Sequence, residues 1–268
     1  MSALLKIGVP VLNRGDLLRS LVASIDVEAE VLVILNRIGG ADPSVEEAAG
    51  KLEARAGGMV RVRVERSAGN LGVAGSWNRI MDWAGGGCWL VNSDIAFQPG
   101  VLQEAMAQVK RRPEIVLHHL RSAACFYATA EFRATLGWFD ENFYPAYHED
   151  EEMALRCARL GGGQADLEGL RERVWHGGSL TLKNAERRQR QFIQEAQRAA
   201  GTYLRRRWGA LPAPGELPAK RSPFDNPTWH PADWTLDLVA RAELARRCEE
   251  ITGAECPVVW HRARGGLG

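Results

Sequence analysis

The sequence predicts an α/β fold, in which a mostly parallel central sheet is flanked by helices and followed by a helical and extended C-terminal tail. Strand-like and helix-like patterns alternate through the first half of the chain, which is typical of βαβ units with right-handed crossovers. From Trp208 onward the sequence becomes rich in proline and turn-forming residues. We therefore expect one domain over residues 1–207 and an extension over 208–268 that packs on it.

The individual elements follow from hydrophobic periodicity. Runs of apolar or alternating residues predict strands at 6–11, 30–36, 60–66, 88–97, 114–120 and 124–129. One-sided apolar stripes predict helices from Asp16, from Ser44 to Arg55, from Val73 to Trp83, from Pro99 to Arg111, and over about 150–162, 183–207 and 235–251. Ligands of such sheets bind beyond the carboxyl ends of the strands. We therefore expect the chemistry in the polar segments that follow the strands.

Composition places the chain among ordinary globular proteins. It is 46% hydrophobic and 25% charged, which is enough apolar sequence for a sizeable core. No run approaches the roughly 18 apolar residues of a membrane span, and the N-terminus lacks a signal-peptide pattern, so we expect a cytoplasmic protein. The cysteines form no CxxC pair, and we expect free, mostly buried thiols at Cys88, Cys125, Cys157, Cys248 and Cys256.

Charge is unevenly distributed along the chain. Residues 171–221 hold 12 Lys and Arg against 4 Asp and Glu, although the whole chain has a net charge of only +1. Such a stretch is either a solvated helix or a surface for phosphates, a nucleic acid or another anionic partner.

Three polar motifs stand out as candidate sites. Asn92, Ser93 and Asp94 follow a buried strand, where they form either a turn or a place for a divalent cation that bridges a carboxylate to phosphates. The acidic cluster that begins at Glu149 precedes a helix; acids are favourable there without any catalytic role, but four in succession also suit a general base of raised pKa. His176 precedes two glycines and could complement a carboxylate as a metal ligand.

The glycine-rich segment 67–79 excludes two common nucleotide-binding classes. Its glycines are spaced G-x-x-G-x-x-G and follow the third expected strand, and no G-x-x-x-x-G-K-[ST] occurs. The sequence therefore argues against a Rossmann dehydrogenase and a P-loop NTPase.

Taken together and in order, five segments resemble the family 2 glycosyltransferases of the GT-A fold, especially the small, soluble, stand-alone members found in bacteria and phages. The segments cover about residues 4–182 and read "IGVPVLNR", "NLGVAGSWNR", "WLVNSDIAFQPG", "GWFDENFYPAYHEDEEMALRCARLGG" and "HGGS". The third matches the family's metal-binding DXD segment in its N-S-D variant, so Asn92 departs from a full DXD. In the fourth, Glu152 stands where the family more often has Asp.

The resemblance implies roles for individual residues. Asp150 would be the catalytic base with Glu149 in support, and Asp94 and His176 would ligate Mn²⁺ or Mg²⁺. Arg156 would anchor the local acids. The acceptor side would include Trp138, Asp140 and Tyr147. The nucleotide sugar would lie against Pro10, Asn13, Arg14, Asn36, Asn70, Gly72, Asn78, Asn92, Ser93 and Asp94.

The implied activity is that of an inverting, metal-dependent glycosyltransferase of the hexosyltransferase type (EC 2.4). It would move a sugar from a nucleoside-diphosphate sugar, for which we expect a UDP- or TDP-sugar, to a hydroxyl of a glycan, a protein or a nucleic acid. The sequence leaves the oligomeric state open. One alternative is a sugar nucleotidyltransferase, which "PVLNRGD" disfavours because it is not a glycine-rich phosphate loop. Another is a non-catalytic domain that binds a nucleotide sugar or glycan, which the retention of Asp94, Asp150 and His176 disfavours.

Overall fold

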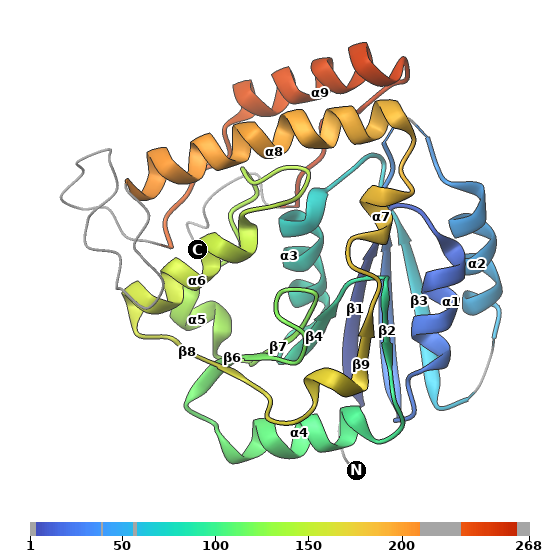
Figure 1. Ribbon diagram of the computed structural model, residues 1–268, viewed down its shortest axis with the longest axis vertical. Coiled ribbons are helices and arrows are strands. Elements are labelled where there is room, and N and C mark those ends of the chain that lie inside the picture. The colour runs from blue at the N-terminus through green and yellow to red at the C-terminus, as the bar shows by residue number, and fades with distance from the viewer. Residues whose placement is uncertain (1–3, 39, 56–57, 210–231, 262–268) are drawn as a thin grey trace.

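The computed structural model describes residues 4–38, 40–55, 58–209 and 232–261. A seven-stranded sheet in the order β3-β2-β1-β4-β7-β6-β8 forms the centre (Figure 1). Only β7 runs antiparallel to its neighbours in it, so the predicted mostly parallel α/β fold is confirmed. The strands of this sheet are β1 (Leu5–Val11), β2 (Ala29–Leu35), β3 (Val60–Arg66), β4 (Cys88–Val91), β6 (Ile115–His119), β7 (Cys125–Ala128) and β8 (Gly163–Asp166).

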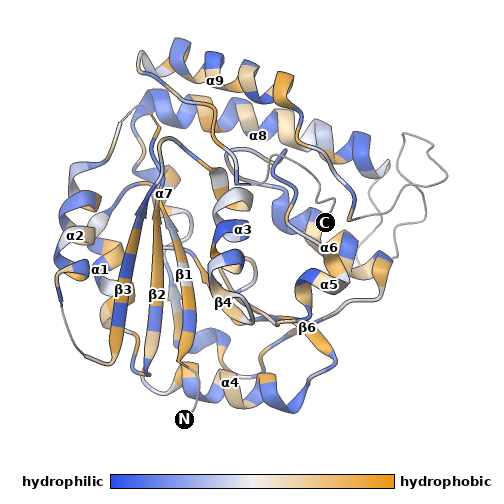
Figure 2. Cartoon of the chain, turned by 180° about the vertical axis from the view of Figure 1, so that it is seen from behind, coloured by the Kyte–Doolittle hydropathy of each residue, from blue (hydrophilic) through white to orange (hydrophobic). Residues whose placement is uncertain are grey.

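Helices cover both faces of the sheet (Figure 1). Because successive side chains of a strand point to opposite faces, Val31 and Val33 pack in one core cluster and Leu32 and Ile34 in another. Buried residues of three helices belong to the first cluster: α1 (Gly15–Ala23), α2 (Pro43–Glu53) and α4 (Val101–Arg111). Buried residues of three others belong to the second cluster: α3 (Gly72–Ala84), α5 (Phe132–Leu136) and α6 (Glu149–Leu160). The edge strand β3 alternates apolar and hydrophilic residues, as its sequence predicts (Figure 2).

The predicted strand over 88–97 is divided in the structure. β4 ends at Val91, and the Asn92 carbonyl accepts a hydrogen bond from the Ile95 amide at 3.2 Å, which closes a turn. The chain then enters β5 (Ile95–Phe97), which pairs antiparallel with β9 (Val174–His176) in a separate two-stranded sheet. The sequence pattern did not predict β8, β9 or α5, and it predicted that the second helix begins at Ser44. This helix, α2, begins at Pro43 and is capped by Asp42, because the Asp42 carboxylate accepts hydrogen bonds from the Ser44 and Val45 amides.

The C-terminal part of the described chain packs on α8 (Arg187–Trp208), which a separate short helix, α7 (Leu180–Lys183), precedes. Helix α9 (Leu238–Thr252) lies along α8 (Figure 1). Their shared cluster includes Phe192 and Ile193 from α8 and Ile251 from α9. No helix in the described ranges is both long and apolar enough to span a bilayer.

The expectation of five free thiols is wrong for two of them. Cys248 and Cys256 form a disulfide, whereas Cys88, Cys125 and Cys157 are free and buried. The chain turns back after α9 and brings the two Cα atoms to 6.1 Å, within the range that a disulfide can bridge. Sequence spacing alone could not reveal this approach.

Candidate active site

A cavity of about 450 Å³ lies where the carboxyl ends of β1, β2 and β4 meet the loop before α6. This volume suits a small-molecule ligand. The sequence-predicted residues that line it are Pro10, Asn36, Asn70, Gly72, Asn92, Ser93, Asp94, Tyr147, Glu149, Asp150 and His176. The structure thus brings together residues from six separate segments of the chain, at the sheet edge where polar strand ends predicted a site.

Asp94 and His176 lie side by side in this cavity. The antiparallel pairing of β5 with β9 sets Ile95 opposite His176, which leaves Asp94 Oδ1 3.6 Å from His176 Nε2. The other carboxylate oxygen, Oδ2, accepts a hydrogen bond from the Leu180 amide at 3.3 Å. Asp94 is 4% exposed, so its carboxylate is held in one orientation by the surrounding backbone.

The pair offers one oxygen and one nitrogen ligand to a divalent cation. The described ranges contain no group of three or more His, Cys, Asp or Glu side chains arranged to hold a metal ion. Mg²⁺ and Mn²⁺ in phosphate-binding sites commonly take only one or two protein ligands and complete their coordination with phosphate oxygens and water. The donor set of Asp94 and His176 therefore fits a cation that is shared with a phosphorylated ligand.

The asparagines at the strand ends shape the cavity wall. Asn36 donates to Ser76 Oγ at 2.9 Å and accepts from the Leu71 amide at 2.8 Å. Asn70 accepts from the Gly72 amide at 2.8 Å. Gly72 has a φ of 74°, and a Cβ there would lie 2.8 Å from the Pro145 carbonyl oxygen. Only glycine allows the backbone at residue 72 to lie this close to Pro145. The contact joins the start of α3 to the loop that carries Tyr147.

Glu149 and Asp150 begin α6 and face the same cavity. Two residues before them adopt left-handed backbone conformations, with φ of 79° at Tyr147 and 71° at His148. Such strain in non-glycine residues concentrates at functional sites. Asp150 has an exposed side chain, and partial enclosure by the surrounding protein raises its pKa.

Glu149 is the more enclosed of the two acids. It is 6% exposed, and within the described structure its Oε2 has no hydrogen-bond partner. Burial and the neighbouring Asp150 charge raise the pKa of Glu149 from an ordinary 4.5 to about 8. Glu149 is therefore protonated at neutral pH, and its carboxyl group offers a hydrogen-bond donor to a ligand in the cavity.

The cavity does not include every predicted residue. Asn13, Arg14, Asn78, Trp138 and Asp140 are not among its lining. Arg14 donates to the Asp16 carboxylate at 2.6 and 2.8 Å. Asn78 exchanges two hydrogen bonds with the Phe139 backbone, at 2.8 and 2.9 Å, and thereby anchors the segment that precedes the acidic cluster.

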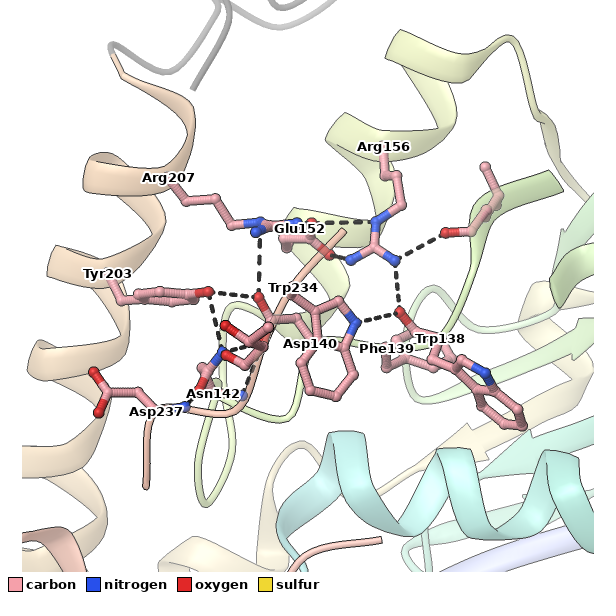
Figure 3. Close-up of polar contacts among 12 residues, drawn as sticks. Trp138, Phe139, Asp140, Asn142, Glu152, Arg156, Tyr203, Arg207, Trp234 and Asp237 are labelled. Carbon is pink, nitrogen blue, oxygen red and sulfur yellow. Dashed lines mark hydrogen bonds and ion pairs between the residues drawn. The ribbon is translucent and has the colours of Figure 1, made fainter. Parts of the chain in front are cut away.

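Asp140 belongs to a buried polar network that also includes Glu152, the last acid of the cluster (Figure 3). Tyr203 donates to its Oδ2 at 2.7 Å, and the Asn142 side chain donates to its Oδ1 at 2.8 Å. Arg207 lies 3.7 Å from Oδ2 and also donates to Glu152 at 3.4 Å. These contacts fix the loop before α6 against α8 (Figure 3).

Arg156 completes this network from α6. It forms a fully buried ion pair with Glu152, and its Nη1 donates to the Leu136 and Trp138 carbonyl groups at 2.9 and 2.6 Å. The Trp138 carbonyl also accepts from Trp234 Nε1 at 3.3 Å (Figure 3). Arg156 thus ties α6 to the backbone that follows α5.

Four polar residues of the cavity were not predicted from the sequence: Arg121, Ser122, Arg171 and Ser179. Arg121 and Ser122 precede β7, and Arg171 begins a short 3₁₀ helix that leads into β9. Arg171 lies in the positively charged stretch 171–221, which could have indicated a residue for an anionic ligand. No feature of the sequence around Arg121 indicates such a role. Two guanidinium groups at this cavity favour an anionic ligand.

No protein-family model and no curated protein matches the chain. Among solved structures, it is similar to the mannosyltransferase PcManGT from Pyrobaculum calidifontis in complex with GDP-Man and Mn²⁺. That match has a TM-score of 0.51 at 15% identity and covers 62% of this chain and 55% of the other, so the chain spans about half the length of the mannosyltransferase.

The chain is also similar to residues 1–349 of TarS from S. aureus. Here the TM-score is 0.52 at 14% identity, with 76% of this chain and 73% of the other covered. Identities this low establish a shared architecture rather than a shared reaction. The α/β fold with its mostly parallel sheet thus matches the GT-A-like fold of these glycosyltransferases.

Proposed function

We propose that this chain is an inverting, metal-dependent glycosyltransferase of the hexosyltransferase type. It transfers a sugar from a nucleoside-diphosphate sugar to an acceptor hydroxyl. The observation that carries the proposal is the convergence of Asp94 and His176 with Glu149 and Asp150 on one cavity of about 450 Å³. The shared fold with a mannosyltransferase that binds GDP-Man and Mn²⁺ supports it.

Each group has a chemical task in this proposal. Asp94 and His176 hold Mn²⁺ or Mg²⁺, which when bound supplies positive charge that stabilises the departing diphosphate. Arg121 and Arg171 line the same cavity and add positive charge for the diphosphate. Asp150 accepts the proton of the acceptor hydroxyl as it attacks the anomeric carbon. Glu149, protonated at neutral pH, donates a hydrogen bond to the sugar or the acceptor.

The donor side is formed by the strand ends. Pro10, Asn36, Asn70 and Gly72 line the cavity at the carboxyl edge of the sheet, where open α/β sheets bind their ligands. We propose that they contact the nucleotide of the donor, a UDP- or TDP-sugar. Asn92 and Ser93 lie in the turn beside Asp94 and contact the sugar or the diphosphate.

The acceptor is a glycan, a protein or a nucleic acid. The positive stretch 171–221 is only partly available for docking, because Arg173 pairs with Glu104 and Arg207 is buried beside Asp140 and Glu152. Its last residues, 210–221, lie outside the described residues. Salt-sensitive DNA binding by the purified protein would favour a nucleic-acid acceptor, and its absence would exclude one.

We also propose that residues 1–207 form the catalytic domain and that 208–268 are an extension packed on it. The packing of α9 against α8 supports this division. The Cys248–Cys256 disulfide closes the end of α9.

A donor screen tests the function directly. Purified protein is incubated with Mn²⁺ and a panel of UDP-, TDP- and GDP-sugars, and release of the nucleoside diphosphate is measured with and without EDTA. We expect EDTA-sensitive release from one donor class and an inverted anomeric configuration in the product. Release of pyrophosphate from a nucleoside triphosphate and a sugar phosphate would instead identify a nucleotidyltransferase. Donor binding without turnover for any acceptor class would identify a binding domain.

A further inference from the structure

A second cavity of about 350 Å³ lies between α8, α9 and the segment 141–144. It shares no lining residue with the first cavity. Its walls are largely apolar, and they include Ala196 and Ala200 from α8 and Leu244 from α9. Its polar lining includes Arg241 on the first turn of α9, and this side chain has no role in the proposed transfer reaction.

Arg241 is buried without hydrogen bonds from its side chain to any residue that the structure describes. It is 4% exposed, and among the described residues its Nε, Nη1 and Nη2 atoms have no hydrogen-bond partner. A guanidinium group carries five N–H donors and stays protonated in proteins. Burial of an unsatisfied charge is among the most costly arrangements in a folded chain, so these donors call for an acceptor that enters the cavity.

The guanidinium group is held in place by an aromatic ring. Its Cζ lies 3.7 Å from the centroid of the buried Tyr144 ring, which is a cation–π contact. This contact does not supply a hydrogen-bond acceptor to the Arg241 nitrogens.

The two acids whose charges act on Arg241 are already engaged by other groups, as is Asp237 of the cavity lining, which accepts from the Ala240 amide. Asp140 accepts from Tyr203 and Asn142, and Glu141 accepts from the Asn78 side chain and from the His261 amide. Their charges attract Arg241 from a distance, and burial nevertheless lowers its pKa. Neither acid forms a hydrogen bond with Arg241 that would satisfy its donors.

We propose that this second cavity is a binding site for a small organic anion, whose carboxylate or phosphate group pairs with the Arg241 guanidinium. The planar fork of an arginine matches both groups in a bidentate geometry. The apolar walls from Ala196, Ala200 and Leu244 accommodate the carbon skeleton of such a ligand. The site lies beside α9, so its occupancy stabilises the packing of the extension on α8.

Thermal unfolding at constant ionic strength tests the proposal. Inorganic phosphate, acetate, butyrate and benzoate serve as separate probes, with chloride as the reference anion. We expect at least one probe to raise the unfolding midpoint by about 2 °C or more, because a ligand that binds only the folded state stabilises it. A greater effect of benzoate than acetate identifies an organic carboxylate, and a response to phosphate alone identifies a phosphate ligand.

Two variants locate the effect. Arg241→Met keeps the apolar length but removes the donors, so the anion response disappears, while the midpoint without anion stays equal or rises because an unpaired buried charge is gone. Arg246→Met changes an exposed arginine of the same helix and retains the response. Ala199→Trp places a large ring at the cavity while it leaves Arg241 intact, and it also abolishes the response.

The proposal is overturned if no probe exceeds chloride in the parent, or if Arg241→Met responds as the parent does. A large fall of the midpoint in Arg241→Met without anion would assign Arg241 a structural role instead. Stabilisation by UDP with Mn²⁺ is measured in the same variants and in Asp94→Ala, and the part that is lost in Asp94→Ala but retained in Arg241→Met reports on the first cavity. The proposed function of the first cavity and the proposed anion site in the second cavity can therefore be tested independently.

Discussion

Asp94 Oδ1 and His176 Nε2 lie 3.6 Å apart although the two residues are distant in sequence. The approach results from a small antiparallel pairing, in which β5 begins directly after Asp94 and β9 ends at His176. The Gly177 amide also donates to the Asp94 carbonyl at 2.9 Å. The backbone thus fixes the distance between the carboxylate and the imidazole, as a site for one shared cation requires.

Replacement of either member of this pair should impair metal-dependent donor binding. We expect Asp94→Ala and His176→Ala each to weaken the binding of UDP in the presence of Mn²⁺ by about tenfold or more, as measured by calorimetry. Asp166→Ala, at an exposed aspartate on the edge strand β8, is the control and should bind as the parent does. Unchanged Mn²⁺ dependence in His176→Ala would remove this residue from the ligand set.

The two acids at the start of α6 should differ in their effects. Asp150→Asn should lower the turnover number by about 10²- to 10⁴-fold, the usual contribution of a general base, with little change in donor binding. Glu151→Gln alters the next acid, which is exposed and contacts His148, and should retain turnover. Full activity in Asp150→Asn would show that another group accepts the proton.

Glu149 should make the stability of the protein depend on pH. Its pKa is about 8 in the folded state against an ordinary 4.5, so its contribution to stability is complete below pH 4.5 and is lost as pH rises through 8. At about 1.4 kcal/mol for each pKa unit, the free energy of unfolding falls by several kcal/mol over this interval.

Glu149→Gln tests this expectation, because a neutral amide does not titrate. Urea unfolding from pH 4.5 to pH 9 should show a flatter profile for the variant, which becomes more stable than the parent at the alkaline end. Glu151→Gln again serves as the control and should follow the parent. Parallel profiles for Glu149→Gln and the parent would contradict the raised pKa.

The network around Asp140 should affect stability more than donor binding. Tyr203→Phe removes the hydroxyl that donates to Asp140 Oδ2 at 2.7 Å, which leaves a buried carboxylate oxygen short of a donor and should cost about 1–3 kcal/mol. Urea unfolding measures this loss. An unchanged free energy of unfolding would show that the bond contributes nothing net.

Asp140→Asn separates the structural role of this residue from the predicted acceptor role. If Asp140 only supports the loop before α6, the variant loses stability and keeps its KM for the acceptor. A selective rise in the acceptor KM at unchanged stability would restore Asp140 to the acceptor side.

Periodicity and local polarity were sufficient to predict much of the fold and part of the site. Alternating apolar residues predicted the strand that is β3. The apolar stripe in the sequence of α1 coincides with the face of this helix that is buried in the structure. The polar strand ends also predicted the edge of the sheet at which the cavity lies. These features depend on local sequence, since burial of one face dictates the residue period.

Local sequence patterns could not show whether some polar residues belong to the cavity or to the core. Asn78 and Asp140 carry polar groups of the expected kind, yet their partners Phe139 and Tyr203 satisfy them inside the protein. The sequence does not distinguish a polar residue that binds a ligand from one that forms its hydrogen bonds within the core. Arg121 likewise became a cavity residue only through the turn that precedes β7.

The sequence by itself determined the α/β alternation, the polar strand ends and the acidic start of α6, because each follows from local propensity and residue period. The tertiary structure alone decided that β5 pairs with β9, that Cys248 meets Cys256, and that the Arg241 side chain is buried without a hydrogen bond to any described residue. The physical reason is that distances between remote segments depend on how the whole core packs, and no local pattern encodes them.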